Sequence, residues 1–234
     1  MGIAFMDIFS GLCDVIGIQA ALAERERSGL GQHVDISLLD SMTVVLVNRA
    51  MNFLVSGKAL TRLGNAHPNI SPYDTFRTKT VDIFIGAGNN RAFAKLCSEV
   101  ARQDLLADPR FANNSDRVKN RDVLKVELET ALMRIDGVEL ADTLARAGLA
   151  SGPIHNTAQV VAHPHTQHRQ MIVEKEWYKA LGSPIKLSRT PASLRSLPPK
   201  FGEHSREVLT EFGFEEHEVD ALLASGVVPT VRHT

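Results

Sequence analysis

The sequence has few cysteines, tryptophans and tyrosines, and no excess of charge of either sign. Its 234 residues include two cysteines, one tryptophan and two tyrosines, and 26 basic side chains stand against 27 acidic ones. Two cysteines cannot make a disulfide framework, which favours a reducing compartment. The net charge of −1 leaves no basic surface that would argue for nucleic acid.

Long apolar runs and targeting signals are missing too. No unbroken apolar run reaches the roughly 18 residues that a bilayer span needs. The first residues lack a basic stretch and reach an acid at Asp7, so they do not resemble a signal peptide. We therefore expect a cytoplasmic protein of mixed structure, with no membrane and no nucleic-acid partner.

The pattern of apolar residues predicts more helix than strand. Residues 7–27 are apolar on almost every side, as in a buried helix. Further helices are expected at 38–56, 90–100, 116–135, 138–147, 205–212 and 215–224. Short strands are expected at 33–37, 74–78, 81–85, 152–155, 172–176 and 184–187. The second and third of these strands should form a hairpin and the last two should pair, while residues 58–72 form a long loop.

The position of the first helix is unusual. The most apolar helix begins at residue 7, with almost nothing before it to cover it. A free N-terminus seldom supplies the deepest element of a core. We expect its cover to come from another chain or from sequence that has been lost.

Asp7 opens this helix in an apolar context and has two interpretations. It can be an N-terminal aspartate that the helix dipole favours and that caps free N–H groups, which is a structural role. It can also be a carboxylate held in a dry pocket, where it acts as a nucleophile or a base. Asp14, two turns later on the same face, is a weaker candidate for either role.

The loop between Arg62 and Asn69 is the second candidate site. It contains Gly64, Asn65, Ala66, His67 and Pro68 in succession. Its length and its glycine suit an ordinary connector and a mobile cover over a ligand equally well. His67 has restricted backbone freedom beside Pro68 and shows no partner, so a catalytic role for it is not favoured.

Three other groups of residues are interpreted as structural. Residues 86–90 follow a strand and precede a helix, but they lack the spacing of a dinucleotide or phosphate loop. His163, His165 and His168 have no nearby cysteine or carboxylate, so no metal is expected there. Neither Cys13 nor Cys97 has a neighbourhood that would activate a thiol, and both are expected in the core.

Taken together, these segments resemble the class III CoA-transferases, the CaiB/BaiF family, which includes formyl-CoA:oxalate and carnitine CoA-transferases and α-methylacyl-CoA racemases. The most specific stretch runs from Asp7-x-x-x-Gly11 through residues 18–22 and 25–32 to residues 34–40. Further matches are Arg62-x-Gly64-Asn65-x-His67-Pro68, Pro72-Tyr73, and residues 88–97, 108–111, 120–121, 152–154, 191–192 and 202–209. They follow the family order over essentially the whole chain.

The resemblance implies roles for particular residues. Asp7 matches the catalytic aspartate, which attacks an acyl-CoA thioester to form an acyl-aspartyl anhydride and then an aspartyl-CoA thioester. Residues 64–68 match the loop that covers the substrate, although His67-Pro68-Asn69 replaces a glycine run. Family racemases have an acidic residue where this chain has Asn89 and Asn90. An amide cannot exchange a proton near neutral pH, so a transferase is favoured, with Asn89 as a possible active-site neighbour.

The resemblance also implies a fold and partners. The fold class is α/β and helix-rich: the C-terminal part of a class III CoA-transferase, with part of a Rossmann-like large domain and a smaller α+β domain. The expected divisions are a large-domain remnant with the catalytic helix (1–57), a linker loop with the small domain (58–170), and a segment that returns towards the large domain (171–234).

The substrates implied are acyl-CoA, as the carrier of coenzyme A, and a small carboxylic acid. No permanently bound cofactor is expected, and the implied assembly is a homodimer. The long N-terminal region that carries most of the family's CoA contacts has no counterpart here, so we expect a fragment, a misplaced start or a split gene. A racemase and a non-catalytic subunit of a split transferase remain the alternatives.

Overall fold

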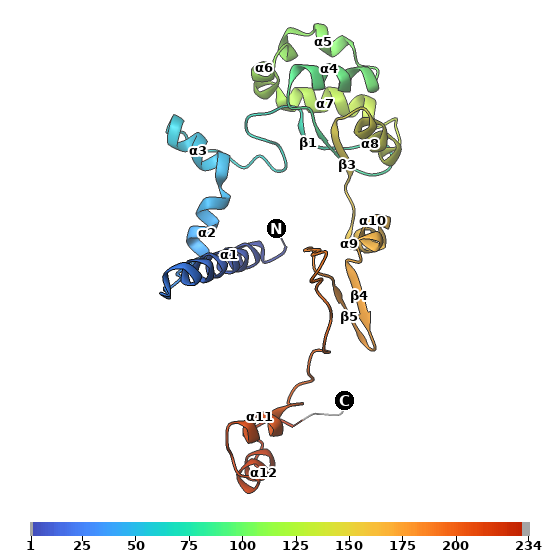
Figure 1. The fold of residues 1–234 in the computed structure, drawn as a ribbon. Coiled ribbons are helices and arrows are strands. Elements are labelled where there is room, and N and C mark those ends of the chain that lie inside the picture. The colour runs from blue at the N-terminus through green and yellow to red at the C-terminus, as the bar shows by residue number, and fades with distance from the viewer. Residues whose placement is uncertain (1, 231–234) are drawn as a thin grey trace. The chain divides into compact units, whose positions relative to one another are not determined.

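Figure 1 shows the computed structural model, which describes residues 2–230. The chain divides into two compact units, Met1–Ile154 and His155–Thr234. This boundary coincides with neither of the boundaries expected after residues 57 and 170, and the three-part division stays a prediction.

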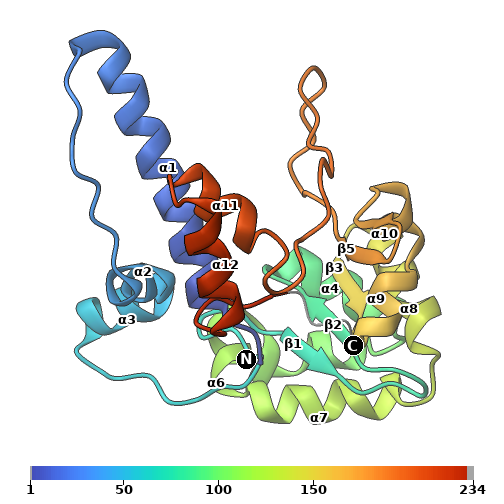
Figure 2. The same ribbon diagram turned by 90° about the horizontal axis from the view of Figure 1, so that it is seen from below.

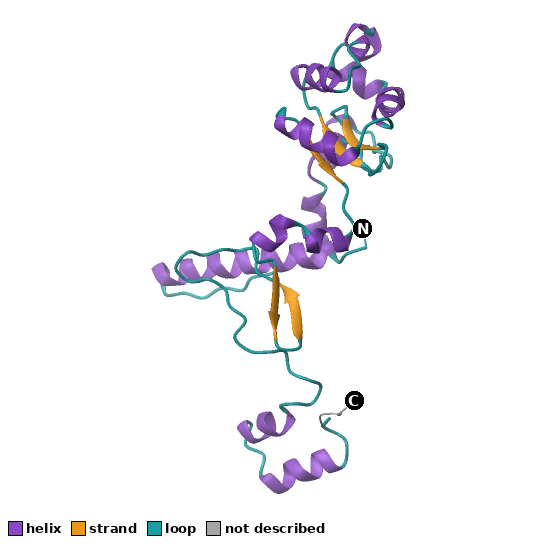
Figure 3. Ribbon diagram, turned by 90° about the vertical axis from the view of Figure 1, so that its right-hand side faces the viewer, coloured by secondary structure: helices purple, strands orange, loops and turns teal. Residues whose placement is uncertain are grey.

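The first unit contains most of the secondary structure. Its elements are α1 (Phe5–Ser28), α2 (Leu38–Val45), α3 (Val47–Ser56), β1 (Tyr73–Phe76), β2 (Ile83–Gly86), α4 (Asn90–Glu99), α5 (Asp104–Ala107), η1 (Pro109–Phe111), α6 (Asn114–Lys119), α7 (Arg121–Leu132), α8 (Gly137–Arg146) and β3 (Ala150–Pro153). Those of the second unit are α9 (Thr157–Ala162), α10 (Pro164–His168), β4 (Ile172–Lys175), β5 (Tyr178–Leu181), α11 (Ser205–Glu211) and α12 (Glu216–Ala224). Figure 3 shows that helices predominate among the described residues, which confirms the helix-rich fold class.

A three-stranded antiparallel sheet organises the core of the first unit. The strand order is β1-β2-β3, with Tyr73 opposite Gly86 and Ile83 opposite Pro153. Helix α7 contacts β1, and α8 contacts β2 and β3 (Figure 2). The hairpin expected from residues 74–85 is confirmed, with its strands displaced by one or two residues.

The hydrophobic core lies between this sheet and helices α4 to α8. On β2, Ile83 and Ile85 alternate onto the buried face, as the period of two in a strand requires. Three leucines repeat every fourth residue along α7 and are fully buried: Leu124, Leu128 and Leu132. The apolar residues that alternate along β2 and those that repeat every fourth position along α7 therefore pack in one cluster, which includes residues from Phe76 to Leu149.

Two of the expected helices are broken. The helix expected at 38–56 is α2 followed by α3, with a bend of 73° between them. Val47 begins α3 with a φ of +40°, which is unusual for a β-branched residue, and neither proline nor glycine marks the position. The helix expected at 116–135 is α6 followed by α7, because Asn120 ends α6 and its side chain donates to the Asp116 carbonyl oxygen (2.9 Å).

Two strand predictions are wrong. Residues 33–37 alternate in sequence but belong to neither sheet of the described residues, and Ser37 instead caps α2 by accepting from the Asp40 N–H. Alternation sets which way side chains face, but a strand also needs a partner for its N–H and C=O groups. Strand β4 pairs with β5, not with residues 184–187. The two-residue turn between them places Glu176 at a φ of +54°, where glycine or asparagine is the usual residue.

Helix α1 is apolar but largely exposed. Ile16 is 68% exposed, and Ser10 is the buried residue of this helix. By length and composition α1 alone is able to cross a membrane, as is the bent pair α2 and α3 taken together. Polar residues interrupt the apolar run within α1, which is why the sequence did not indicate a span. The core helices of globular proteins have the same length and composition.

The second unit has little core of its own. Val219 on α12 is its fully buried apolar residue among those described. Helices α9 and α12 each begin with a capping box, at Asn156 and at Glu215. The two closing helices are confirmed within a residue of their expected ends.

Candidate functional site

The candidate nucleophile Asp7 lies in the first turn of α1 and is exposed. Position four, an alanine, is the N-cap, and no side chain makes a capping hydrogen bond there. The expected capping role is therefore wrong, and Asp7 supports this helix end through its charge alone. The expected dry pocket is also absent around Asp7 in the described residues. Asp14 is likewise exposed.

The loop from Lys58 to Pro72 has two differently held halves. Residues 59–62 make no hydrogen bond within the described chain. Gly64, with a φ of +60°, begins the turn that follows, a conformation that glycine adopts without strain. Ala66 donates to the Leu63 carbonyl oxygen, and the Asn65 side chain donates to Thr75 Oγ1 on β1 (3.2 Å). From His67 onwards the loop is held from several sides.

Arg121, at the start of α7, holds the middle of the loop. Its Nη1 donates to the His67 carbonyl oxygen (2.9 Å) and its Nη2 to the Pro68 carbonyl oxygen (2.9 Å). Asn114 of α6 holds the next stretch: its Nδ2 donates to the Asn69 carbonyl oxygen (2.8 Å), and its Oδ1 accepts from the Ser71 N–H (3.2 Å). The second half of the loop is therefore held by hydrogen bonds, and the choice between a connector and a mobile cover stays a prediction.

Arg117 holds the end of the loop from inside the protein. It is fully buried, and its Nε donates to the Ser71 carbonyl oxygen (2.8 Å). Its other nitrogens donate to the Phe111 carbonyl oxygen (3.1 Å) and to Asn90 Oδ1 (3.0 Å). The guanidinium also lies 4.5 Å from the centre of the Phe93 ring. All three hydrogen-bond acceptors are neutral, so none is a carboxylate.

His67 joins the loop to α3. The Asn69 N–H donates to His67 Nδ1 (3.1 Å). On the other side of the ring, Asn48 Nδ2 lies 3.2 Å from His67 Nε2. Asn52, one turn later on α3, exchanges two hydrogen bonds with Asn69. Burial lowers the pKa of His67, and the positive charges of Arg49 and Arg121 lower it further. His67 is therefore a neutral positioning group at pH 7.

Asn89 acts locally as a helix cap. Its side chain accepts from the Ala92 N–H (2.9 Å) at the start of α4, and the residue is exposed. The turn at residues 86–90 is thus closed by its own cap, and the Ala87 N–H is used by the Pro72 carbonyl oxygen. The structural interpretation of this turn is the one that these contacts support.

The histidine cluster and the cysteines have no features of a reactive site. No group of three metal-binding side chains occurs in residues 2–230. His163 caps α10 by accepting from the His165 N–H. Cys97 is buried in the core, as expected, and burial raises the pKa of its thiol to about 11. Cys13 is only half-buried, so the core position expected for it is wrong in the described chain.

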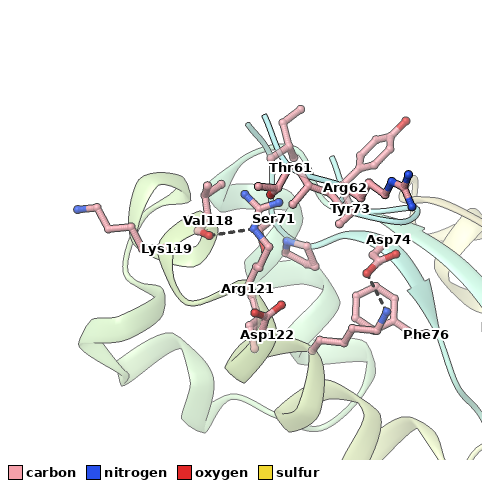
Figure 4. Close-up of a pocket in the computed structure, with 16 residues that line it drawn as sticks. Thr61, Arg62, Ser71, Tyr73, Asp74, Phe76, Val118, Lys119, Arg121 and Asp122 are labelled. Atoms are coloured by element: carbon pink, nitrogen blue, oxygen red, sulfur yellow. Dashed lines mark hydrogen bonds and ion pairs between the residues drawn. The ribbon is translucent and has the colours of Figure 1, made fainter. Parts of the chain in front are cut away.

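A cavity of about 590 Å³ lies between the loop and helices α6 and α7. The loop contributes residues from Thr61 to Pro72, and the two helices contribute Arg121 and Asp122 among others. Figure 4 shows Arg62 on the loop side of this cavity, with Arg121 and Asp122 on the helix side. Lys125 Nζ and Asp74 Oδ2, which both belong to lining residues, form an ion pair (2.7 Å). Of the predicted loop residues, Ala66 lines this cavity.

Sequence reasoning missed the residues that fix the loop. Arg117, Arg121 and Asn114 lie 40 or more positions from the loop. Arg121 belongs to the matched pair 120–121, but that match gives it no role at the loop. The one usable signal is the pair Asn48 and Asn52, two asparagines four positions apart on α3. Such a pair lies on one face of the helix and indicates a polar contact there.

Comparison with known proteins gives a consistent result. The family model described as CoA-transferase family III matches residues 1–205. A succinate–glutarate CoA-transferase of Agrobacterium fabrum is 36% identical over 90% of this chain and 54% of its own length. The human succinyl-CoA:glutarate CoA-transferase is 31% identical over 97% of this chain and 53% of its own length.

A solved structure agrees with these relatives. The crystal structure of a CaiB/BaiF family protein from Brucella suis is 42% identical to this chain, with a TM-score of 0.74. The match covers 90% of this chain and 56% of that one. The chain thus spans about half the length of the relatives it matches. On these matches, the chain belongs to CoA-transferase family III.

Proposed function

We propose that this chain is part of an acyl-CoA:carboxylate CoA-transferase in which Asp7 is the nucleophile. The observation that carries the proposal is the family match over residues 1–205, which includes the Asp7-x-x-x-Gly11 element and the loop at Gly64-Asn65. Coenzyme A enters as a substrate, bound as its thioester, and no other cofactor is required.

The reaction proceeds through two covalent states of the aspartate. The Asp7 carboxylate attacks the thioester carbonyl and the C–S bond breaks. CoA departs as a thiolate, and the acyl group is now joined to Asp7 as an acyl-aspartyl anhydride. The thiolate then attacks the aspartyl carbonyl of this anhydride and releases the donor acid as a carboxylate, which leaves an aspartyl-CoA thioester. The acceptor carboxylate repeats the two steps in reverse order and departs as the new acyl-CoA. No net proton transfer is needed.

The position of Asp7 in the first turn of α1 suits this chemistry. The partial positive charge of a helix N-terminus stabilises the ionised carboxylate, which is the nucleophilic form. A carboxylate stripped of water is a stronger nucleophile. Because Asp7 is exposed in the described chain, we propose that a partner polypeptide or a second copy of this chain covers it in the active state, as a homodimer would.

Transfer is favoured over racemisation by the residue at position 89. A racemase needs an acid or a base that exchanges the α-proton of the substrate. Asn89 has a carboxamide instead, and its oxygen is already used as the cap of α4. The arrangement therefore supports carboxylate exchange.

The substrates proposed are an acyl-CoA and a small dicarboxylic acid. The relatives are named for succinate, glutarate, oxalate and mesaconate, each of which carries two carboxylates. We place this chemistry in the cytoplasm, among enzymes that interconvert CoA thioesters.

The test compares Asp7→Asn with Asp14→Asn, which makes the same change two turns later on α1. The protein is purified under native conditions with any polypeptide that accompanies it, and exchange of CoA between succinyl-CoA and glutarate is followed by chromatography. We expect Asp7→Asn to lose at least a thousandfold in rate, as removal of a covalent nucleophile does, and Asp14→Asn to keep most of it. Full exchange by Asp7→Asn, or no exchange by the unaltered protein, contradicts the proposal.

A further inference from the structure

The cavity between the loop and helices α6 and α7 has an excess of positive charge. Four cationic side chains line it: Arg62, Lys119, Arg121 and Lys125. Two carboxylates line it as well, Asp74 and Asp122. How these charges are paired decides what the cavity can bind.

One cation and one carboxylate cancel each other. Lys125 Nζ lies 2.7 Å from Asp74 Oδ2, and the ammonium also lies 5.6 Å from the centre of the Phe76 ring. This pair has no net charge to offer a ligand. Asp122 is exposed on α7, as are Arg62 and Lys119, so solvent screens all three of these charges.

The charge of Arg121 is not neutralised by any of its hydrogen-bond partners. Its three bonds go to the carbonyl oxygens of Val118, His67 and Pro68, which are neutral acceptors. Behind the same wall, the buried Arg117 bonds the carbonyl oxygen of Ser71, a lining residue, again without a carboxylate. Two guanidinium charges therefore lie at the wall with neutral hydrogen-bond partners. Low-dielectric walls strengthen such a field inside a cavity.

Arg62 adds a cation on the loop side. It is exposed, makes no ion pair or hydrogen bond among residues 2–230, and belongs to the half of the loop that is not held. Lys119 lies at the rim, 71% exposed and 3.7 Å from Asp116. A guanidinium on an unheld segment is able to turn onto a planar anion and form two parallel N–H···O bonds with it.

We propose that this cavity binds a carboxylate group of the acid substrate, with Arg62 as the residue that contacts it and Arg117 and Arg121 as the source of the surrounding field. The proposal rests on the transferase function proposed above, because a dicarboxylic acid has one carboxylate for the exchange and a second that needs a cation. The cavity, at about 590 Å³, is larger than a dicarboxylic acid requires. Specificity for diacids over monoacids then depends on Arg62.

The experiment measures binding directly, without catalysis. Glutarate is titrated into the native protein by isothermal calorimetry, and acetate and 3′,5′-adenosine diphosphate are titrated in parallel. We expect Arg62→Gln to weaken glutarate binding about tenfold, as loss of one charge-assisted contact does. The matched control is Arg146→Gln, an exposed arginine of α8 that does not line the cavity; it should leave the affinity unchanged.

Three results would overturn the assignment. One is equal weakening by Arg62→Gln and Arg146→Gln, which indicates unspecific attraction. Another is glutarate binding that Arg62→Gln leaves intact, whatever the effect of Lys119→Gln. The third is displacement of bound glutarate by 3′,5′-adenosine diphosphate at low concentration, which assigns the cavity to the phosphates of CoA. Circular dichroism of each variant shows whether the fold is kept.

The fate of this proposal is separable from that of the transferase function. Glutarate binding that depends on Arg62 in a protein without exchange activity removes the transferase and keeps the pocket. Exchange that proceeds with an unchanged KM for glutarate in Arg62→Gln removes the pocket and keeps the transferase.

Discussion

The helices α1 to α3 and the core between Phe76 and Leu149 are both rich in apolar residues, yet only one of them buries these residues. Leu128 of α7 is fully buried, whereas Leu12 of α1 is 55% exposed and Val55 of α3 is 84% exposed. Exposed apolar surface on this scale is normally covered by a partner. The small core is therefore complete within the described chain, while the helix that carries Asp7 is not.

The largest expected difference is between two leucine-to-alanine variants, one in each region. Leu128→Ala leaves a cavity in the core and should lower the free energy of unfolding by about 2–5 kcal/mol. Leu12→Ala removes an exposed side chain and should change it by less than about 0.5 kcal/mol in the chain alone. Amide hydrogen exchange at Ile85, on β2, measures the change in the free energy of unfolding in both variants. Equal losses would break the comparison, because they would require α1 to be packed.

Arg117 tests whether the loop depends on the core. Arg117→Met leaves the Ser71 and Phe111 carbonyl oxygens and Asn90 Oδ1 without their donor. We expect a loss of about 2–3 kcal/mol, since unpaired buried polar groups are costly while removal of a buried charge offsets part of that cost. Hydrogen exchange should also become faster at Ser71. A variant with unchanged exchange at Ser71 would show that other contacts hold the loop.

Glu129 gives a pH-dependent test within the core unit. Burial alone would raise the pKa of Glu129, but hydrogen bonds from Arg77 and the charges of Arg77 and Lys125 outweigh it and hold the pKa below its usual value. A carboxyl group whose pKa is lower in the folded state stabilises the fold fully above pH 4.5. This stabilisation is lost as the pH falls through the lowered pKa. Glu129→Gln should thus lose about 1 kcal/mol at pH 7, and the difference should shrink at pH 3. Urea unfolding at both pH values measures it.

His67 gives the smallest expected effect. It is a base, whereas Glu129 is an acid. Its pKa is lowered by burial and by Arg49 and Arg121, so the fold favours the neutral ring. The resulting stabilisation is complete above pH 6.5 and is lost as the pH falls through the lowered pKa. Relative to His67→Gln, the unaltered protein should become less stable between pH 7 and pH 5. Exchange rates at Asn69, corrected for intrinsic pH dependence, report this; parallel behaviour of both proteins would contradict it.

The elements that the sequence predicted well are those with strong local signals. The helix at 90–100 has Asn89 as its cap, and the hairpin has a period of two on both strands. The Asp7 motif and the loop at Gly64 were located because short motifs of the family contain them. The family itself was therefore recognisable from the sequence.

What the sequence did not predict depends on distant contacts. The break at Val47 has no glycine or proline to mark it, and Glu176 takes a turn position typical of glycine. A buried arginine such as Arg117 contradicts the general preference of this residue for the surface. The environment of Asp7 is not determined by local sequence either, because cover for α1 is not among the described residues.

The identity of the nucleophile can be measured directly by trapping. Hydroxylamine added during turnover with succinyl-CoA and glutarate converts an aspartyl thioester or anhydride into a hydroxamate, and mass spectrometry of peptides locates it. The account predicts modification of Asp7 that requires succinyl-CoA. Exchange that proceeds while Asp7 remains unmodified, or with the hydroxamate on Asp14, would contradict it.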